Sequence, residues 1–205
     1  MARKTKEEAA KTRKEIIDAA RRVFHKHGVV RSTLEKIAKE AGVTRGAIYW
    51  YFKNKTELFF AMREDVIETM LVPVDQLLLT NQFADPLDAI EASLNEFFRV
   101  LQECPVVREL FEIMISRCEY VDEFSRVQEE VGRPAQEFLE KMVRIYQLAA
   151  TKGRMRKDLD PLVMARDTWA FTSGLLYRLV SCQLGQGLYT EIAGMIQAHI
   201  ALRRA

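Results

Sequence analysis

The chain has 205 residues, of which 48% are hydrophobic and 29% are charged, a balance typical of a globular protein with its own core. No stretch approaches the roughly 20 consecutive apolar residues of a membrane span, and the N-terminal sequence MARKTKEEAAKTRKE lacks the apolar segment of a secretion signal. The three cysteines, Cys104, Cys118 and Cys182, are an odd number at wide spacing, which favours a reducing compartment over a disulfide framework. The sequence therefore predicts a cytoplasmic protein.

The charges are divided unevenly along the chain. Residues 1–55 carry 15 Lys and Arg against 6 Asp and Glu, a net charge of +9, whereas the remaining residues carry a net charge of −7. A basic segment joined to an acidic one predicts a polyanionic partner for the basic segment alone. The alternative is a basic helix surface that is only solvated.

A first helix is predicted from about Glu7 to Lys26, ending at Gly28, with one apolar face. A second begins at Ser32 and Glu35, which fit a capping box, because a Ser hydroxyl and a Glu carboxylate satisfy each other's free backbone N–H groups. Its apolar positions are spaced as one helix face, and Gly42 is expected to end it in the left-handed conformation. These features predict a helix-turn-helix.

The next helix is expected to begin at Thr44, its capping residue, and to present the segment Thr44-Arg45-Gly46. Arg45 has the chemistry for a bidentate contact with guanine O6 and N7, Gly46 would allow close backbone approach, and Ala47 could touch a thymine methyl. Ile48 and Phe52 are expected to pack inside the N-terminal domain that contains these helices. The segment therefore predicts insertion of a helix into a DNA major groove.

The remainder of the chain has helical periodicity almost throughout. After a cap pair at Asn54 and Glu57, a helix is expected to run toward residue 80 with a bend near Pro73. Further helices are expected at roughly 86–103, 105–116, 122–152, 161–184 and 188–203. The predicted fold is all-α, with a head at residues 1–55 and a larger helical body at residues 56–205.

Residues 1–60 resemble the DNA-binding domain of the TetR family, and the segments MARKTKEEA and AGVTRGAIYW are similar to AcrR-type regulators of multidrug efflux pumps. In the body, the run Arg117-Cys118-Glu119-Tyr120 is close to one in that subgroup. The resemblance implies a homodimeric repressor that binds double-stranded operator DNA and is released by a hydrophobic or aromatic inducer. It also implies that the body holds the ligand-binding and dimerisation functions.

In TetR-like proteins, the positions of Thr33, Tyr49, Tyr51 and Lys55 contact phosphates. The family commonly has His where this chain has Tyr51, although a phenol can also donate to a phosphate. Trp50 is either a contact on the phosphate side or a plug on the head surface. The complete set of predicted DNA-binding residues is Thr33, Thr44, Arg45, Gly46, Ala47, Tyr49, Trp50, Tyr51 and Lys55.

The body is rich in Met and aromatic side chains, which adapt to flat hydrophobic compounds but are also common in cores. Positions resembling the AcrR-type pocket, together with nearby polar groups, give the predicted ligand contacts: Asn95, Phe111, Ile115, Gln136, Met142, Trp169, Ser173 and Tyr177. The candidate dimer surface consists of apolar residues near the C-terminus that could instead belong to the protomer's core: Leu175, Leu176, Leu179, Val180, Ile192, Met195, Ile196 and Ile200.

Catalysis has little support in the sequence. The histidines His25, His27 and His199 have no partners at metal-ligand spacing, and no phosphate loop or dinucleotide motif is present. We therefore expect no cofactor, no metal and no enzymatic activity. Three rivals stay open: a regulator with an acyl ligand, a DNA-binding protein without small-molecule input, and a helical enzyme. Cys118, beside Arg117, is either an oxidant sensor with a lowered pKa or a buried, inert thiol.

Overall fold

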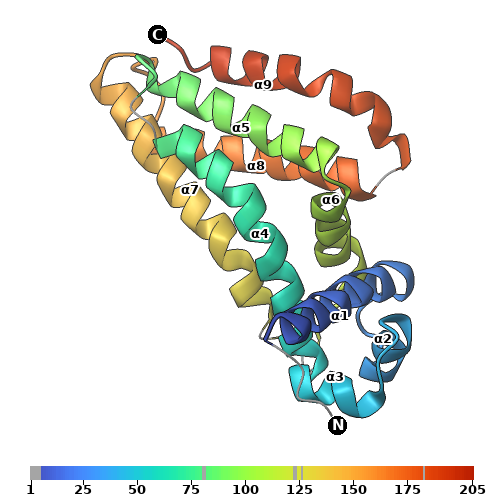
Figure 1. Ribbon diagram of the computed structural model, residues 1–205. Helices are drawn as coiled ribbons and strands as arrows, with labels where there is room; N and C mark the ends of the chain where they lie inside the picture. Colours follow the sequence, from blue (N-terminus) through green and yellow to red (C-terminus); the bar gives the residue numbers. More distant parts are fainter. Residues whose placement is uncertain (1–5, 80–81, 122–123, 126, 182) are drawn as a thin grey trace. The chain divides into compact units, whose positions relative to one another are not determined.

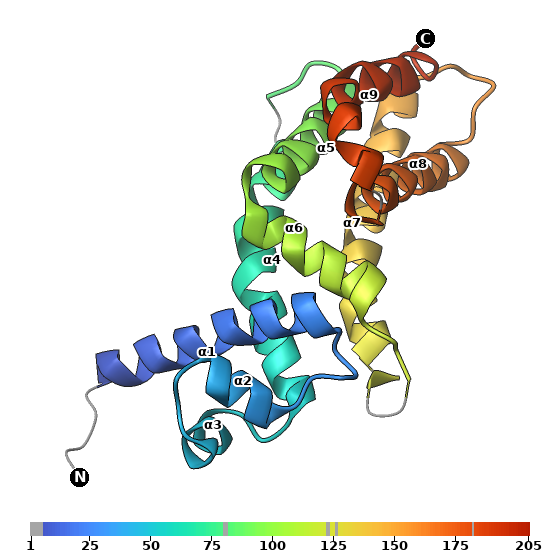
Figure 2. The same ribbon diagram turned by 90° about the vertical axis from the view of Figure 1, so that its right-hand side faces the viewer.

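A computed structural model describes residues 6–79, 82–121, 124–125, 127–181 and 183–205 (Figures 1 and 2). Cys182 lies outside the described residues, as do Arg3 and Lys4 of the basic N-terminal segment. The named elements in the described part are all helical, and the isolated β-bridge found there joins Met155 to Arg204. The predicted all-α fold is therefore confirmed.

The chain forms two compact units. The first comprises Met1–Ile67 and Glu109–Gln128, and the second comprises Glu68–Arg108 and Glu129–Ala205. None of the helices in the described ranges is long and apolar enough to cross a membrane.

The first unit contains α1 (Lys6–His27), α2 (Leu34–Glu40), α3 (Arg45–Tyr51) and the first part of α4 (Lys55–Leu79). Its core is aliphatic and aromatic, with fully buried side chains from all four helices. Burying each such side chain stabilises the fold by about 1.5–3 kcal/mol. The residues that form this core include Ile16, Phe24, Ile37, Ile48, Leu58 and Phe59.

A second stretch of chain completes this unit by attaching to α1. The backbone N–H of Val29 donates to the carbonyl of Arg117 at 2.9 Å, directly after Gly28 has ended α1 with φ of +77°. The His25 Nε2 lies 2.5 Å from Glu112 Oε2, and Arg21 pairs with Glu109. Residues 109–117 are thereby held along α1 by one backbone hydrogen bond and two side-chain pairs.

Residues 109–117 comprise the end of α6 (Pro105–Glu112) and all of η1 (Ile113–Arg117), which is π-helical. A single α-helix over 105–116 was expected, so the sequence pattern missed this change of hydrogen bonding. The spacing of apolar residues in the sequence does not indicate a π turn, because one inserted residue shifts the helix face only locally.

The second unit contains α5 (Pro86–Glu103), most of α7 (Val127–Thr151), α8 (Pro161–Ser181), η3 (Gln183–Thr190) and α9 (Ile192–Ala201). Prolines begin α5, α6 and α8 as predicted, because the first helical position needs no backbone N–H donor. Pro73 and Pro134 lie inside α4 and α7. The expected helix at 188–203 is wrong at its start, since η3 precedes α9.

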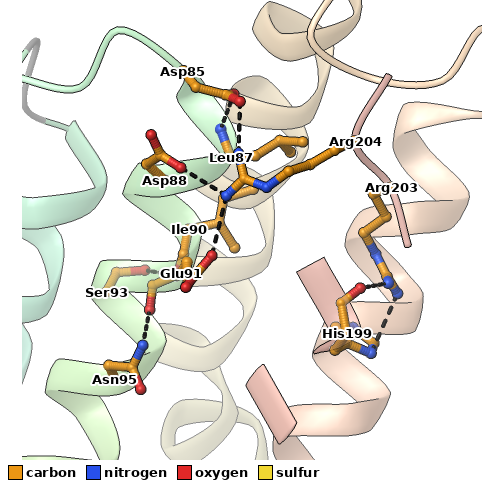
Figure 3. A network of polar contacts seen from close by, with 10 residues as sticks. All are labelled: Asp85, Leu87, Asp88, Ile90, Glu91, Ser93, Asn95, His199, Arg203 and Arg204. Carbon is orange, nitrogen blue, oxygen red and sulfur yellow. Dashed lines mark hydrogen bonds and ion pairs between the residues drawn. The ribbon is translucent and has the colours of Figure 1, made fainter. Parts of the chain in front are cut away.

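Polar contacts fasten the C-terminus to α5 and α8. Arg204 lies within 2.6 Å of Asp85, 2.7 Å of Asp88 and 3.1 Å of Glu91, all at the start of α5 (Figure 3). The neighbouring Arg203 is buried and pairs with Asp167 of α8. Helix α9 is therefore held in place by the ion pairs of the residues that follow it, as well as by the burial of its apolar side chains.

Most of the predicted dimer residues form the core of this unit instead. Leu175, Leu179 and Val180 of α8 are buried, as are Ile192, Ile196 and Ile200 of α9. The remaining two, Leu176 and Met195, are half-buried. For the six buried side chains the core alternative is therefore correct, because the helical period identifies an apolar face but not the neighbour that covers it. For Leu176 and Met195, a dimer contact stays a prediction.

Candidate DNA-binding surface

Thr33, and not Ser32, caps helix α2. The Thr33 Oγ1 accepts from the Lys36 backbone N–H at 3.2 Å, with Thr33 in an extended conformation. Ser32 is buried and donates its hydroxyl to the Gly28 carbonyl at 2.6 Å. The predicted capping box is therefore wrong by one residue, because two adjacent hydroxyl residues are equally suitable caps in the sequence.

The turn between α2 and α3 is formed by Gly42, whose φ is +67°. The Val43 N–H donates to the Ala38 carbonyl at 2.9 Å, and the Gly42 N–H donates to the Lys39 carbonyl at 3.2 Å. These bonds satisfy carbonyls at the end of α2 that otherwise lack partners. The predicted left-handed glycine is confirmed.

Helix α3 has one anchored side and one exposed side. Thr44 caps it, accepting from the Ala47 N–H at 3.1 Å, while Ile48 and Phe52 are buried beneath it. Gly46 is exposed, and a Cβ at this position would meet no atom within 4 Å. The predicted cap and the predicted core residues are confirmed, and the N-terminal segment of the helix is exposed.

Three side chains meet on the exposed side of α2 and α3. The Glu35 Oε1 lies 3.3 Å from Arg45 Nε and accepts a hydrogen bond from the Tyr49 hydroxyl at 3.4 Å. The Arg45 guanidinium lies 5.9 Å from the centre of the Tyr49 ring. The pKa of Glu35 is lowered, first by its own backbone N–H and then by Thr33, Arg45 and Tyr49, so the carboxylate is ionised at neutral pH. The sequence pattern indicates only a capping role for Glu35, and its contacts with α3 come from the fold.

The remaining predicted contacts lie around the end of α3. Trp50 is 73% exposed, and its ring meets the Tyr51 ring edge-on at 4.6 Å. The Lys55 Nζ lies 3.4 Å from the Val30 carbonyl oxygen and 5.3 Å from the centre of the Phe124 ring. Lys55 is the first residue of α4, so its ammonium group is held at the edge of the helix-turn-helix.

The start of α4 is fixed by a reciprocal pair of caps. The Glu57 N–H donates to Asn54 Oδ1 at 2.8 Å, and the Glu57 carboxylate accepts from the Lys53 N–H at 2.8 Å. The predicted cap pair of Asn54 and Glu57 is confirmed, with the second bond made one residue earlier than in a standard capping box.

Residues 16–62 match the family model described as bacterial regulatory proteins, tetR family. The chain is 31% identical to the solved structure of SmeT, the repressor of the Stenotrophomonas maltophilia multidrug efflux pump SmeDEF, with a TM-score of 0.73 and coverage of 94% of this chain and 90% of SmeT. This chain belongs to the TetR family. SmeT has also been solved in a complex with triclosan.

Two further proteins are similar to this TetR-family chain. NalD, the secondary repressor of the MexAB-OprM multidrug efflux pump in Pseudomonas aeruginosa, is 28% identical with a TM-score of 0.82, each chain being covered to 98%. The regulator AcrR of Shigella flexneri is 42% identical over 133 residues, which is 63% of this chain and 60% of AcrR. The resemblance to AcrR-type regulators is confirmed.

The residues predicted to bind the ligand of this TetR-family regulator are found in different surroundings. Met142 is buried, whereas Gln136 is exposed and Tyr177 is 57% exposed. Asn95 is half-buried and donates its amide to the Glu91 carbonyl at 2.9 Å (Figure 3). The other members of the set are half-buried: Phe111, Ile115, Trp169 and Ser173.

A shallow pocket of about 440 Å³ opens on the first unit, and it contains none of the predicted ligand residues. It lies between α1 and the start of α4, and it has two carboxylates and one guanidinium among its side chains. It is lined by Arg13, Asn54, Thr56, Glu57, Phe60, Ala61 and Glu64.

The two chemical alternatives for Cys118 are now distinguished. Burial raises the pKa of the Cys118 thiol to about 11, against smaller lowering effects of Tyr120 and Lys55. A thiol with this pKa is protonated at neutral pH and reacts slowly with oxidants. Cys118 is half-buried, and its raised pKa favours the inert-thiol alternative over the oxidant sensor. Among the described residues, no group of three His, Cys, Asp or Glu side chains is close enough to hold a metal ion.

Proposed function

We propose that this chain is a homodimeric repressor that binds a palindromic operator, controls a multidrug efflux operon and is released by hydrophobic aromatic compounds. The observation that carries the proposal is the seating of α3. Buried Ile48 and Phe52 anchor one side of the helix, and Arg45 projects from the other with 74% of its side chain exposed. The functional division at residues 1–55 and 56–205 is part of the same proposal.

Each predicted residue of α3 has a role that its position supports. Arg45 reads guanine through two parallel hydrogen bonds, and Ala47 contacts a thymine methyl. Gly46, with open space where a Cβ would lie, permits the backbone to approach the base edges. Thr44 holds the N-terminus of the helix in shape by capping it.

The flanking residues orient the helix by contacting phosphates. Lys55 supplies a positive charge at the edge of the motif and Tyr51 supplies a phenol donor, while Tyr49 lies beside them with its hydroxyl turned to Glu35. Thr33 adds a hydroxyl at the start of α2, and Trp50 lays its exposed ring against the sugar-phosphate backbone. With a net charge of +9 in residues 1–55, these contacts make binding strongly dependent on salt.

Dimerisation uses the outer faces of α8 and α9. These faces expose small side chains, which allow two helices to approach closely, and they also expose Tyr177 and Leu202, the latter at 69%. Two helices from each protomer would form a four-helix contact. The small exposed residues are Ala170, Gly174, Ala193, Gly194 and Ala198.

The inducer is proposed to act on the head through residues 109–117, which belong to the same compact unit as α1. Phe111 and Ile115 lie on this stretch, which is tied to α1 at Glu109, Glu112 and Arg117. A ligand that moves Phe111 would therefore move α1. To turn nearly full operator occupancy into nearly none, the ligand must favour the released state by about 5.5 kcal/mol.

The complex of SmeT with triclosan supports an aromatic inducer over an acyl one. The fatty acid degradation regulator FadR of Bacillus halodurans has the same fold, but at 20% identity it gives no information on the ligand.

Operator recognition is tested by selecting duplexes from a random pool with the purified protein at 150 mM salt, a value at about physiological ionic strength. We expect a palindrome whose half-sites are centred about 34 Å apart or a multiple of this. Recovery of single-stranded DNA, or of duplexes without a shared sequence, would contradict the proposal.

Induction is tested by adding triclosan or dodecanoic acid to the complex with the selected duplex. Release by triclosan alone is expected. Release by dodecanoic acid alone would favour the acyl-ligand regulator, and release by neither would favour a DNA-binding protein without this input. Phe111→Ala should raise the triclosan concentration needed, while Val121→Ala, an exposed change on the same unit, should not.

A further inference from the structure

The Glu35 carboxylate lies beside two residues that are proposed to contact DNA, Arg45 and Tyr49. Glu35 extends from the first turn of α2 toward α3, where its Oε1 serves both Arg45 and Tyr49. Arg45 and Tyr49 are four residues apart and therefore lie on the same face of α3. One oxygen atom of α2 thus contacts two side chains of the neighbouring helix.

This arrangement has an electrostatic cost in a DNA complex. A carboxylate near the groove is repelled by phosphates, and the major groove presents acceptors at guanine O6 and N7, adenine N7 and thymine O4. Only the amino groups of cytosine and adenine offer hydrogen bonds to it. Glu35 is 45% exposed in its side chain and is ionised, so the repulsion is present at neutral pH.

The same contact has a benefit for base recognition. The ion pair is made through Arg45 Nε, which leaves the two terminal amino groups of the guanidinium fork for a bidentate contact with guanine. Both contacts are therefore compatible in one geometry. A guanidinium held at Nε loses less side-chain entropy when it binds guanine, and it is less free to turn toward a phosphate or a different base.

We propose that Glu35 is a specificity-determining positioning residue that orients Arg45 and Tyr49 and lowers the affinity of the head for duplexes without the matching base pair. The proposal rests on the proposed function, since it assigns a role within operator recognition. It makes Glu35 a residue that weakens DNA binding in general and sharpens selection of the operator.

The test is Glu35→Gln in the full-length dimer, measured by fluorescence anisotropy with the selected operator and a scrambled duplex of equal length. Removing one repelling charge per protomer should strengthen binding to the scrambled duplex by about fivefold per charge at physiological salt. The ratio of operator to scrambled affinity should fall by about tenfold, since a good bidentate pair discriminates by about this factor or more. A substitution that merely damaged the fold of the head would weaken binding to both duplexes.

The matched control is Glu40→Gln, which removes the same charge from the same helix. Glu40 pairs with Arg22 of α1 at 2.8 Å and is partly exposed, like Glu35. The control should leave the ratio of the two affinities unchanged. An equal loss of selectivity in both variants would show that net charge, and not the position of Glu35, sets the ratio, and would overturn the proposal.

A double-mutant cycle with Arg45→Ala shows whether Glu35 acts through Arg45. We expect both single variants to lose selectivity at the same base pair of the half-site in a panel of single substitutions. In the Arg45→Ala background, Glu35→Gln should change that selectivity less than twofold. Additive losses, or losses at different base pairs, would overturn the proposal. If wild-type protein selected no operator at all, the proposed function itself would fail, which is a separate outcome.

Discussion

Lys55→Gln should reduce the salt dependence of operator binding by a calculable amount. The Lys55 ammonium lies at the start of α4, 3.4 Å from the Val30 carbonyl oxygen. Each phosphate neutralised contributes about 0.9 to the slope of log affinity against log salt, so a dimer losing two contacts should lose about 1.8 units. Between 50 and 200 mM salt, the wild-type protein should therefore lose about twelvefold more affinity than the variant.

The assay is fluorescence anisotropy with the selected operator at four or more salt concentrations. Loss of the cation–π contact with Phe124 should cost about 0.5–1 kcal/mol at this partly exposed site, so the variant should remain folded. Lys26→Gln is the matched control, because it also removes one positive charge. Lys26 is exposed in the last turn of α1. An unaltered slope for Lys55→Gln, or an equal decrease for Lys26→Gln, would refute a phosphate contact at Lys55.

Gly42→Ala should lower the free energy of unfolding by about 1–2 kcal/mol through backbone strain alone, since φ is +67° and no atom would crowd the new Cβ. Gly132→Ala, inside α7, should raise the free energy of unfolding, because Ala has the higher helix propensity. Burial and the Arg203 cation lower the pKa of His199 to about 4. Between about pH 6.5 and 4 the unfolded chain therefore binds more protons than the folded chain, and the free energy of unfolding should decrease as the pH is lowered. His199→Gln should flatten this pH dependence in thermal unfolding. Ala198→Arg should give monomers by analytical ultracentrifugation, whereas the same change at exposed Ala150 of α7 should not; dimeric Ala198→Arg would disprove the proposed α9 contact.

The helix-turn-helix could be predicted from the sequence because its signals are local. Gly42 ends α2, Thr44 caps α3, and Ile48 and Phe52 face the core, all determined by residues within one or two turns. The error at Ser32 is of the same local kind. Which of two adjacent hydroxyls caps a helix depends on the direction of the incoming chain, and Ser32 is drawn toward the carbonyl of Gly28.

The other differences arise from contacts between distant segments. The apolar sides of α8 and α9 were predicted correctly as apolar, but only their burial shows that they serve the protomer and not a partner. Glu35 was passed over as a functional residue because its importance comes from two side chains of another helix, 10 and 14 residues further along the chain. Periodicity within one helix cannot predict such a contact.

The most direct measurement of the central claim is the affinity ratio between the selected operator and a scrambled duplex at 150 mM salt, with and without saturating triclosan, in the same titration format. Without triclosan, we expect a ratio of about 10³ or more, as is usual for specific DNA recognition. With triclosan, operator affinity should fall toward that of the scrambled duplex. A ratio near one in the absence of triclosan would contradict sequence-specific recognition by α3.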